Sequence, residues 1–191
     1  MPLLFRARPA HTAVRGQLTL NTSFPVHVIR ALHWKVQDTG NYFAVLSLLM
    51  VIVQGPVLSF LSGRVSDVAL VLWGGVILGA SFVLLTIPST AVFYAAAAFF
   101  ALGNGLMWPS FLAVLSKASG ELQRTVQGFA SSAGSAASII GLIAGGLLYD
   151  VIGSRVFQLA AGIIYLVTLL SARLIGVGRG PAAAEGAPAI T

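Results

Sequence analysis

Two amide side chains, Gln54 and Asn104, stand in the middle of long apolar stretches. In hydrocarbon such a side chain needs a hydrogen-bond partner or a water-filled cavity. A proline follows each of them, Pro56 and Pro109, and proline leaves the carbonyl four residues earlier without its helical donor. Broken helices of this kind commonly line binding cavities in membrane proteins. The pattern therefore predicts two polar, non-catalytic contact points for a bound solute.

Trp108 lies between Asn104 and Pro109, and its ring could stack on a flat or cationic solute. Two alternatives stay open. A tryptophan in a membrane span also packs against neighbouring helices or lies at the lipid interface, and a buried amide can simply join two helices. With these alternatives in view, we take Gln54, Asn104 and Trp108 as candidates for a substrate cavity.

Other chemistries lack the residues they need. The sequence has no cysteine, its three histidines all precede residue 34, and the apolar stretches contain no Asp, Glu, His, Lys or Arg. An ion-coupling carboxylate, a metal cluster and a serine–histidine pair are therefore not expected there. The net charge of +6 does not form one basic stripe beside aromatic residues. We expect no enzyme activity, no cofactor, no metal and no nucleic-acid partner.

The candidate residues lie within long uncharged runs of sequence. These runs separate the clusters of charged residues that follow Asp38. About 20 apolar residues cross a hydrocarbon core roughly 30 Å thick. The longest run must fold back once, and 87–90 is its only turn-like sequence. The pattern predicts an all-α integral membrane protein with five transmembrane helices, at about 41–63, 68–86, 91–116, 125–149 and 156–172.

The remaining segments are less regular. Residues 1–16 form a polar, basic arm, and 176–191 resemble a disordered tail after a transmembrane unit at 41–175. Residues 17–40 mix apolar side chains with His27, Arg30, His33 and Lys35. They are interpreted as a partial sixth helix, as an interfacial segment or as an ordinary loop.

Lys and Arg near the span ends set the orientation. One face of the membrane collects more of them than the other, which predicts a cytoplasmic location for 64–67, 117–124 and the C-terminus. The residues on that face are Arg64, Lys117, Arg124, Arg173 and Arg179, against Arg30, Lys35 and Arg155 on the other.

Small residues and charges suggest further roles. Gly134, Gly141 and Gly145 belong to ladders of small residues that allow close helix packing. Asp67 begins the second span, where a carboxylate can cap the helix and meet its dipole. Lys117 and Arg124 could pair with acidic residues or, as we favour, anchor the membrane surface.

Several runs resemble the C-terminal half of major facilitator superfamily transporters, over about 38–174. They are Gly55-Pro56, the segment from Gly63 to Asp67, and Gly103-Asn104-Gly105 with Trp108-Pro109. Two further runs, 124–129 and 138–150, are similar to the penultimate helix of tetracycline and multidrug antiporters. The resemblance implies helices eight to twelve of a twelve-helix transporter, with 17–36 as a remnant of helix seven. Gly63, Asp67 and Arg124 become candidates for a cytoplasmic gate, although the basic residues of the family motif are replaced by 68–71.

The resemblance implies export of small, apolar or amphipathic molecules across the cell membrane by alternating access. It also implies an N-terminally truncated chain that works only with a missing N-terminal half or with a second copy. The alternative is a non-transporting membrane scaffold that binds partners through its small-residue ladders. The substrate and the coupling ion are not identified by the sequence.

Overall fold

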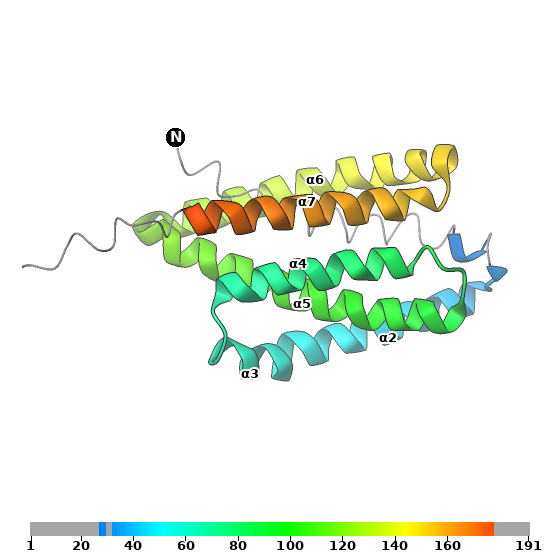
Figure 1. The fold of residues 1–191 in the computed structure, drawn as a ribbon, viewed down its shortest axis with the longest axis horizontal. Helices are drawn as coiled ribbons and strands as arrows, with labels where there is room; N and C mark the ends of the chain where they lie inside the picture. Colours follow the sequence, from blue (N-terminus) through cyan, green and yellow to red (C-terminus); the bar gives the residue numbers. More distant parts are fainter. Residues whose placement is uncertain (1–26, 30–31, 178–191) are drawn as a thin grey trace, which may run out of the picture.

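The structure is a computed structural model, and it describes residues 27–29 and 32–177 of the chain. This part of the chain is helical and contains no strand (Figure 1). Its elements are α2 (Val36–Ile52), η2 (Val53–Val57), α3 (Leu58–Ser62), α4 (Asp67–Leu84), α5 (Thr90–Ser119), η3 (Gly120–Leu122), α6 (Gln123–Ile152) and α7 (Arg155–Val177). Because α2, η2 and α3 follow one another without a break, they form one long rod.

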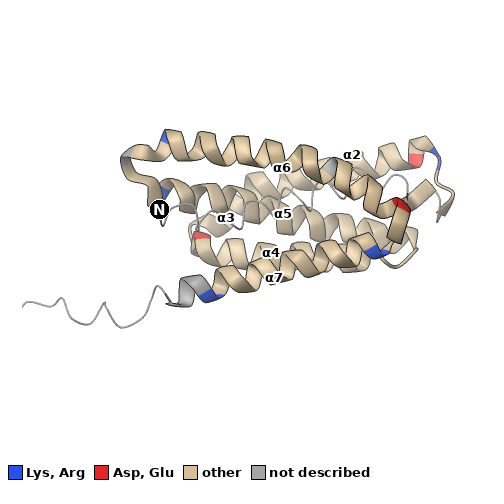
Figure 2. Cartoon of the chain, turned by 90° about the horizontal axis from the view of Figure 1, so that it is seen from above, with Lys and Arg blue, Asp and Glu red and all other residues tan. Residues whose placement is uncertain are grey.

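Five helical rods in the described part are long and apolar enough to cross a membrane. They are the α2–η2–α3 rod and the helices α4, α5, α6 and α7. Figure 2 shows the charged residues at the two ends of the rods, with uncharged residues between them. The expected fold class, an all-α membrane protein with five spans, is confirmed.

The core of the bundle runs along α4 and α5, which are the most deeply buried rods. Helix α5 packs against α4, against α2 and η2, and against α6, while α7 packs against α4 and α6. In Figure 1, α4 and α5 accordingly lie between the α2–η2–α3 rod and the pair α6 and α7. The outer rods α2 and α6 are the least buried.

The contact between α4 and α5 depends on two glycines. A Cβ at Gly103 would lie 2.5 Å from the backbone nitrogen of Leu78 and 2.8 Å from the carbonyl oxygen of Gly74. A Cβ at Gly74 would in turn lie 2.9 Å from the Cβ of Met107. Only glycine permits this approach, which brings the backbones of the two helices into direct contact.

Glycines also set the contact between α4 and α7. A Cβ at Gly75 would collide with Oγ1 of Thr168, and one at Gly79 would lie 2.6 Å from the ring of Tyr165. Here the opposing atoms belong to side chains instead of backbone. Together the two contacts make α4, α5 and α7 a closely packed three-helix layer.

Four of the five rods are longer than the expected spans, whereas α4 ends at Leu84 and not at residue 86. Helix α2 begins at Val36 and not at residue 41, because Asp38 lies in its first turn and accepts a hydrogen bond of 2.9 Å from the backbone N–H of Lys35. Helix α7 continues to Val177, two residues into the expected tail. The basic arm at 1–16, the rest of the tail and most of the segment before α2 lie outside the described residues.

Candidate functional site

The first span contains a π-helical turn at the expected proline break. In η2 the backbone N–H of Leu58 donates to the carbonyl of Val53, five residues earlier. Pro56 has no N–H to offer Ile52, so the regular α-helical pattern cannot continue through this point. Such turns occur frequently at functional sites. The sequence predicted a break at Pro56 but not this winding.

The π-helical turn packs against α5 at Gly105. A Cβ at Gly105 would lie 2.7 Å from Cγ1 of Val53 and 3.6 Å from Cγ of Gln54. Gln54 therefore lies beside the residue that follows Asn104, so the fold brings the two predicted amides onto neighbouring helices. Gln54 is exposed, whereas Asn104 is only 3% exposed. No hydrogen bond joins the two amides in the described part of the chain.

Asn104, Trp108 and Phe111 share one face of α5, because they follow the spacing i, i+4, i+7. Trp108 is half-buried, and its ring centroid lies 6.1 Å from that of Phe111. Pro109 stands inside α5, which remains α-helical to Ser119. We name the three predicted residues, which lie on two neighbouring helices, the Gln54–Asn104–Trp108 site; that they line one substrate cavity stays a prediction. Its groups can hydrogen-bond and stack, and none of them titrates near neutral pH.

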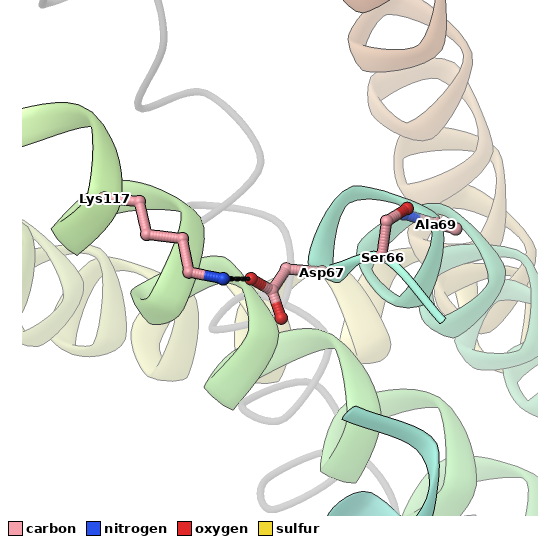
Figure 3. A network of polar contacts seen from close by, with 4 residues as sticks. All are labelled: Ser66, Asp67, Ala69 and Lys117. Atoms are coloured by element: carbon pink, nitrogen blue, oxygen red, sulfur yellow. Dashed lines mark hydrogen bonds and ion pairs between the residues drawn. The ribbon is translucent and has the colours of Figure 1, made fainter. Parts of the chain in front are cut away.

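An ion pair joins the first turn of α4 to the last part of α5 (Figure 3). Nζ of Lys117 lies 2.5 Å from Oδ2 of Asp67, and the Lys117 side chain is 75% exposed. Ser66, not Asp67, caps α4, since its Oγ accepts a hydrogen bond of 3.3 Å from the N–H of Ala69. Asp67 lies in the first turn of α4, where its charge meets the helix dipole, and it pairs with Lys117, the pairing that the sequence left open beside membrane anchoring. A membrane-anchoring role for Lys117 stays a prediction.

The other gate candidates lie nearby along the chain. Gly63 ends α3, and a Cβ there would meet no atom within 4 Å. Arg124 is exposed in the first turn of α6. Among the described residues, the structure brings Asp67 together with Lys117 and not with Arg124. A gating role for Gly63, Asp67 and Arg124 stays a prediction.

The glycine candidates on α6 differ in burial. Gly134 and Gly145 are buried and Gly141 is half-buried, and their role in packing stays a prediction. The close contacts described above involve α4 and α5 instead, and the sequence reasoning missed them. The run Gly74-Gly75 followed by Gly79 was the available signal, because small residues four apart favour close helix contact.

An aromatic cluster at the opposite end of α5 from Lys117 was also missed. The indole N–H of Trp34 donates to Oγ1 of Thr90 over 3.3 Å. The Trp34 ring lies within 6.3 Å, centroid to centroid, of the rings of Tyr42, Phe93 and Tyr94. Aromatic side chains of this type are enriched where a span meets the membrane surface. Through these contacts Trp34, which precedes α2, packs against the start of α5.

Comparison with known proteins agrees with this architecture. The family described as Major Facilitator Superfamily matches residues 15–189, which include all five spans and the Gln54–Asn104–Trp108 site. No individual curated protein matches the chain. The family match supports transport of small molecules across a membrane and indicates no catalytic family. The chain belongs to the major facilitator superfamily.

Proposed function

We propose that this chain supplies one wall of the substrate cavity of a secondary exporter for small apolar or amphipathic molecules. The observation that carries the proposal is the π-helical turn η2, which exposes Gln54 and packs beside Asn104 of α5. Within a span, a hydrogen-bonding group without a partner from the protein is favourable only beside water or a polar ligand. A flexible solute would meet the exposed amide of Gln54 while the rest of the wall offers apolar contact.

The exposed side of η2 is the natural position of such a cavity. A neighbouring exposed residue, Ile52, lies two positions before Gln54, which is roughly half a turn around a helix, whether the winding is α-helical or π-helical. The two side chains therefore point in nearly opposite directions. We assign the Gln54 side to the cavity and the Ile52 side to lipid.

Closing the cavity takes a second set of helices, from an N-terminal half or from a second copy of this chain. Transport would then proceed by alternating access, with the two walls rocking against each other. By this reasoning the five spans alone do not transport. We place the Asp67–Lys117 end and the C-terminus in the cytoplasm and the protein in the cell membrane, as the distribution of Lys and Arg suggests.

Cysteine accessibility tests the cavity side directly, because the chain has no cysteine of its own. Gln54→Cys should react in vesicles with a charged, membrane-impermeant thiol reagent, and Ile52→Cys serves as the matched control from the opposite side. The amphipathic dye rhodamine 6G should protect Gln54→Cys. Equal reactivity of the two cysteines, or failure of Gln54→Cys to react at all, would contradict a water-filled cavity on this side.

A transport assay tests the function itself. In cells that lack their main exporters, rhodamine 6G efflux should require a second set of helices in addition to this chain. Where efflux is observed, Gln54→Leu and Asn104→Leu should reduce it, whereas Gln158→Leu, at an exposed amide of α7, should not. Strong efflux by a purified monomer of the chain alone would refute the need for a second wall.

A further inference from the structure

His27 is a buried titratable side chain that the proposed transport site does not use. Its side chain is 5% exposed, although it precedes the first span and lies apart from the Gln54–Asn104–Trp108 site. Val28, the next residue, is fully buried as well. A short segment outside the five spans is therefore inserted into the end of the bundle through these two side chains.

Three helices supply the walls around the imidazole ring. Its centroid lies 5.8 Å from the ring of Phe93 in α5, 6.0 Å from that of Tyr149 in α6 and 5.3 Å from that of Phe157 in α7. The ring of His27 consequently touches the ends of α5, α6 and α7 at the same time.

The polar contacts of the ring are incomplete. Nδ1 of His27 lies 3.1 Å from the hydroxyl of Tyr149, whereas Nε2 is buried and has no hydrogen-bond partner among the described residues. A neutral imidazole that donates from Nδ1 leaves only a lone pair without a partner. Protonation would add both a charge and a buried N–H without an acceptor, and this arrangement is much less favourable.

Among the described residues, none that contacts the ring carries a charge that would offset this penalty. The titratable group that faces His27 from α6 is the phenol of Tyr149, and the rings that face it from α5 and α7 are uncharged. Asp150 and Arg155, which lie close in sequence to Tyr149 and Phe157, are exposed, and neither forms an ion pair with His27 in the described structure. Burial lowers the pKa of His27 below its usual value of 6.5.

We propose that His27 is a proton-binding site that keeps this end of the bundle closed while it is neutral and releases it when it is protonated. The released imidazolium would regain water, and α5, α6 and α7 would lose the ring that joins them. This regulation is independent of the proposed export function. If the end with Lys117 is cytoplasmic, the proton would arrive from the opposite side of the membrane.

Thiol accessibility next to His27 tests the proposal. Val28→Cys, at a buried position, and Ile29→Cys, at a 47% exposed position, are compared in phosphatidylcholine nanodiscs. N-ethylmaleimide reacts with thiolate, so the ratio of the two alkylation rates removes the common effect of pH on thiol ionisation. We expect the rate at Val28→Cys divided by the rate at Ile29→Cys to rise as the pH falls below 6.5. The rise should be at most about tenfold per pH unit, the limit for uptake of one proton.

Variants identify the group responsible. His27→Phe and His27→Gln should each give a ratio that does not change with pH; the first keeps an aromatic ring and the second a hydrogen-bonding group. His33→Gln, at an exposed histidine of the same segment, should keep the full response. The proposal is overturned if the ratio is constant or falls in acid in the parent chain. It is equally overturned if both His27 variants retain the rise, or if His33→Gln abolishes it.

Discussion

Substitution of Gly103 by alanine tests the contact that fixes α5 against α4. The new Cβ would lie 2.5 Å from the backbone nitrogen of Leu78 and 2.8 Å from the carbonyl oxygen of Gly74. No rotamer change can move these backbone atoms. Relief requires the helices to separate by about 0.9 Å, the difference between 2.5 Å and the 3.4 Å at which ordinary van der Waals contact begins.

The expected loss of stability combines two opposing effects. Overpacking costs about 1–3 kcal/mol, and a clash between two backbones belongs at the upper end of that range. Alanine is favoured over glycine inside a helix by about 1 kcal/mol. Gly103→Ala should therefore lower the free energy of unfolding by about 2 kcal/mol, which is roughly 30-fold in the equilibrium constant.

Gly162→Ala in α7 is the matched control, since a Cβ there meets no atom within 4 Å. It should leave the free energy of unfolding unchanged or raise it by up to about 1 kcal/mol. Both variants can be unfolded by increasing the fraction of dodecyl sulfate in dodecyl maltoside micelles, with helix loss followed by circular dichroism. If Gly103→Ala unfolded at the same dodecyl sulfate fraction as Gly162→Ala, the close contact between α4 and α5 would be wrong.

Three further substitutions probe other contacts in the same unfolding assay. Gly79→Ala should cost about 1 kcal/mol, less than the first substitution, because the atom it meets belongs to the ring of Tyr165, which can move; a loss above that of the first substitution would argue against this. Asp67→Asn should cost less than about 1 kcal/mol, because Lys117 is largely exposed, and the difference should shrink in high salt. The folded chain should lose stability as the pH falls below 6.5, because burial lowers the folded-state pKa of His27 and the unfolded chain then binds the extra proton; His27→Phe should remove this pH dependence.

The five spans could be predicted because a single rule determines them. Charged residues are strongly disfavoured in hydrocarbon, so the positions of Asp67, Lys117 and Arg155 limit where helices can cross. The same rule cannot fix the helix ends. Asp38 is charged, yet it lies inside α2, because a carboxylate in the first turn stabilises a helix that begins outside the hydrocarbon.

Helix contacts were harder to predict because glycines that look alike in sequence have different neighbours. Gly103 touches the backbone of α4, whereas a Cβ added at Gly55 or Gly128 would meet no atom within 4 Å. The rotation of each helix about its own axis decides whether a glycine faces a neighbouring helix. That rotation depends on every contact along the interface. Similarly, the pairing of Lys117 with Asp67 joins residues from different helices that no local pattern connects.

The sequence singled out two amides but could not show how the fold places them. Gln54 and Asn104 stood out because amides are costly in hydrocarbon, and the contact of η2 with α5 at Gly105 places them on neighbouring helices. The different burial of Gln54 and Asn104 could not be read from the sequence, since it depends on which faces of η2 and α5 meet. His27 escaped notice for a related reason, because its burial comes from three helices that follow it in the chain.

The two contacts of α5 differ in stiffness, and this difference indicates where the bundle can move. At Gly103 the opposing atoms of α4 are backbone, so α4 and α5 cannot slide past each other without separating. At Gly105 the nearest atom is Cγ1 of Val53, a side-chain atom in a π-helical turn whose winding already departs from the α-helix. We therefore expect movement of the α2–η2–α3 rod on α5 while α4 and α5 stay together. Because Gln54 lies on the moving side and Asn104 on the fixed side, such a movement would change the spacing of the two amides, as the proposed substrate cavity requires for binding and release.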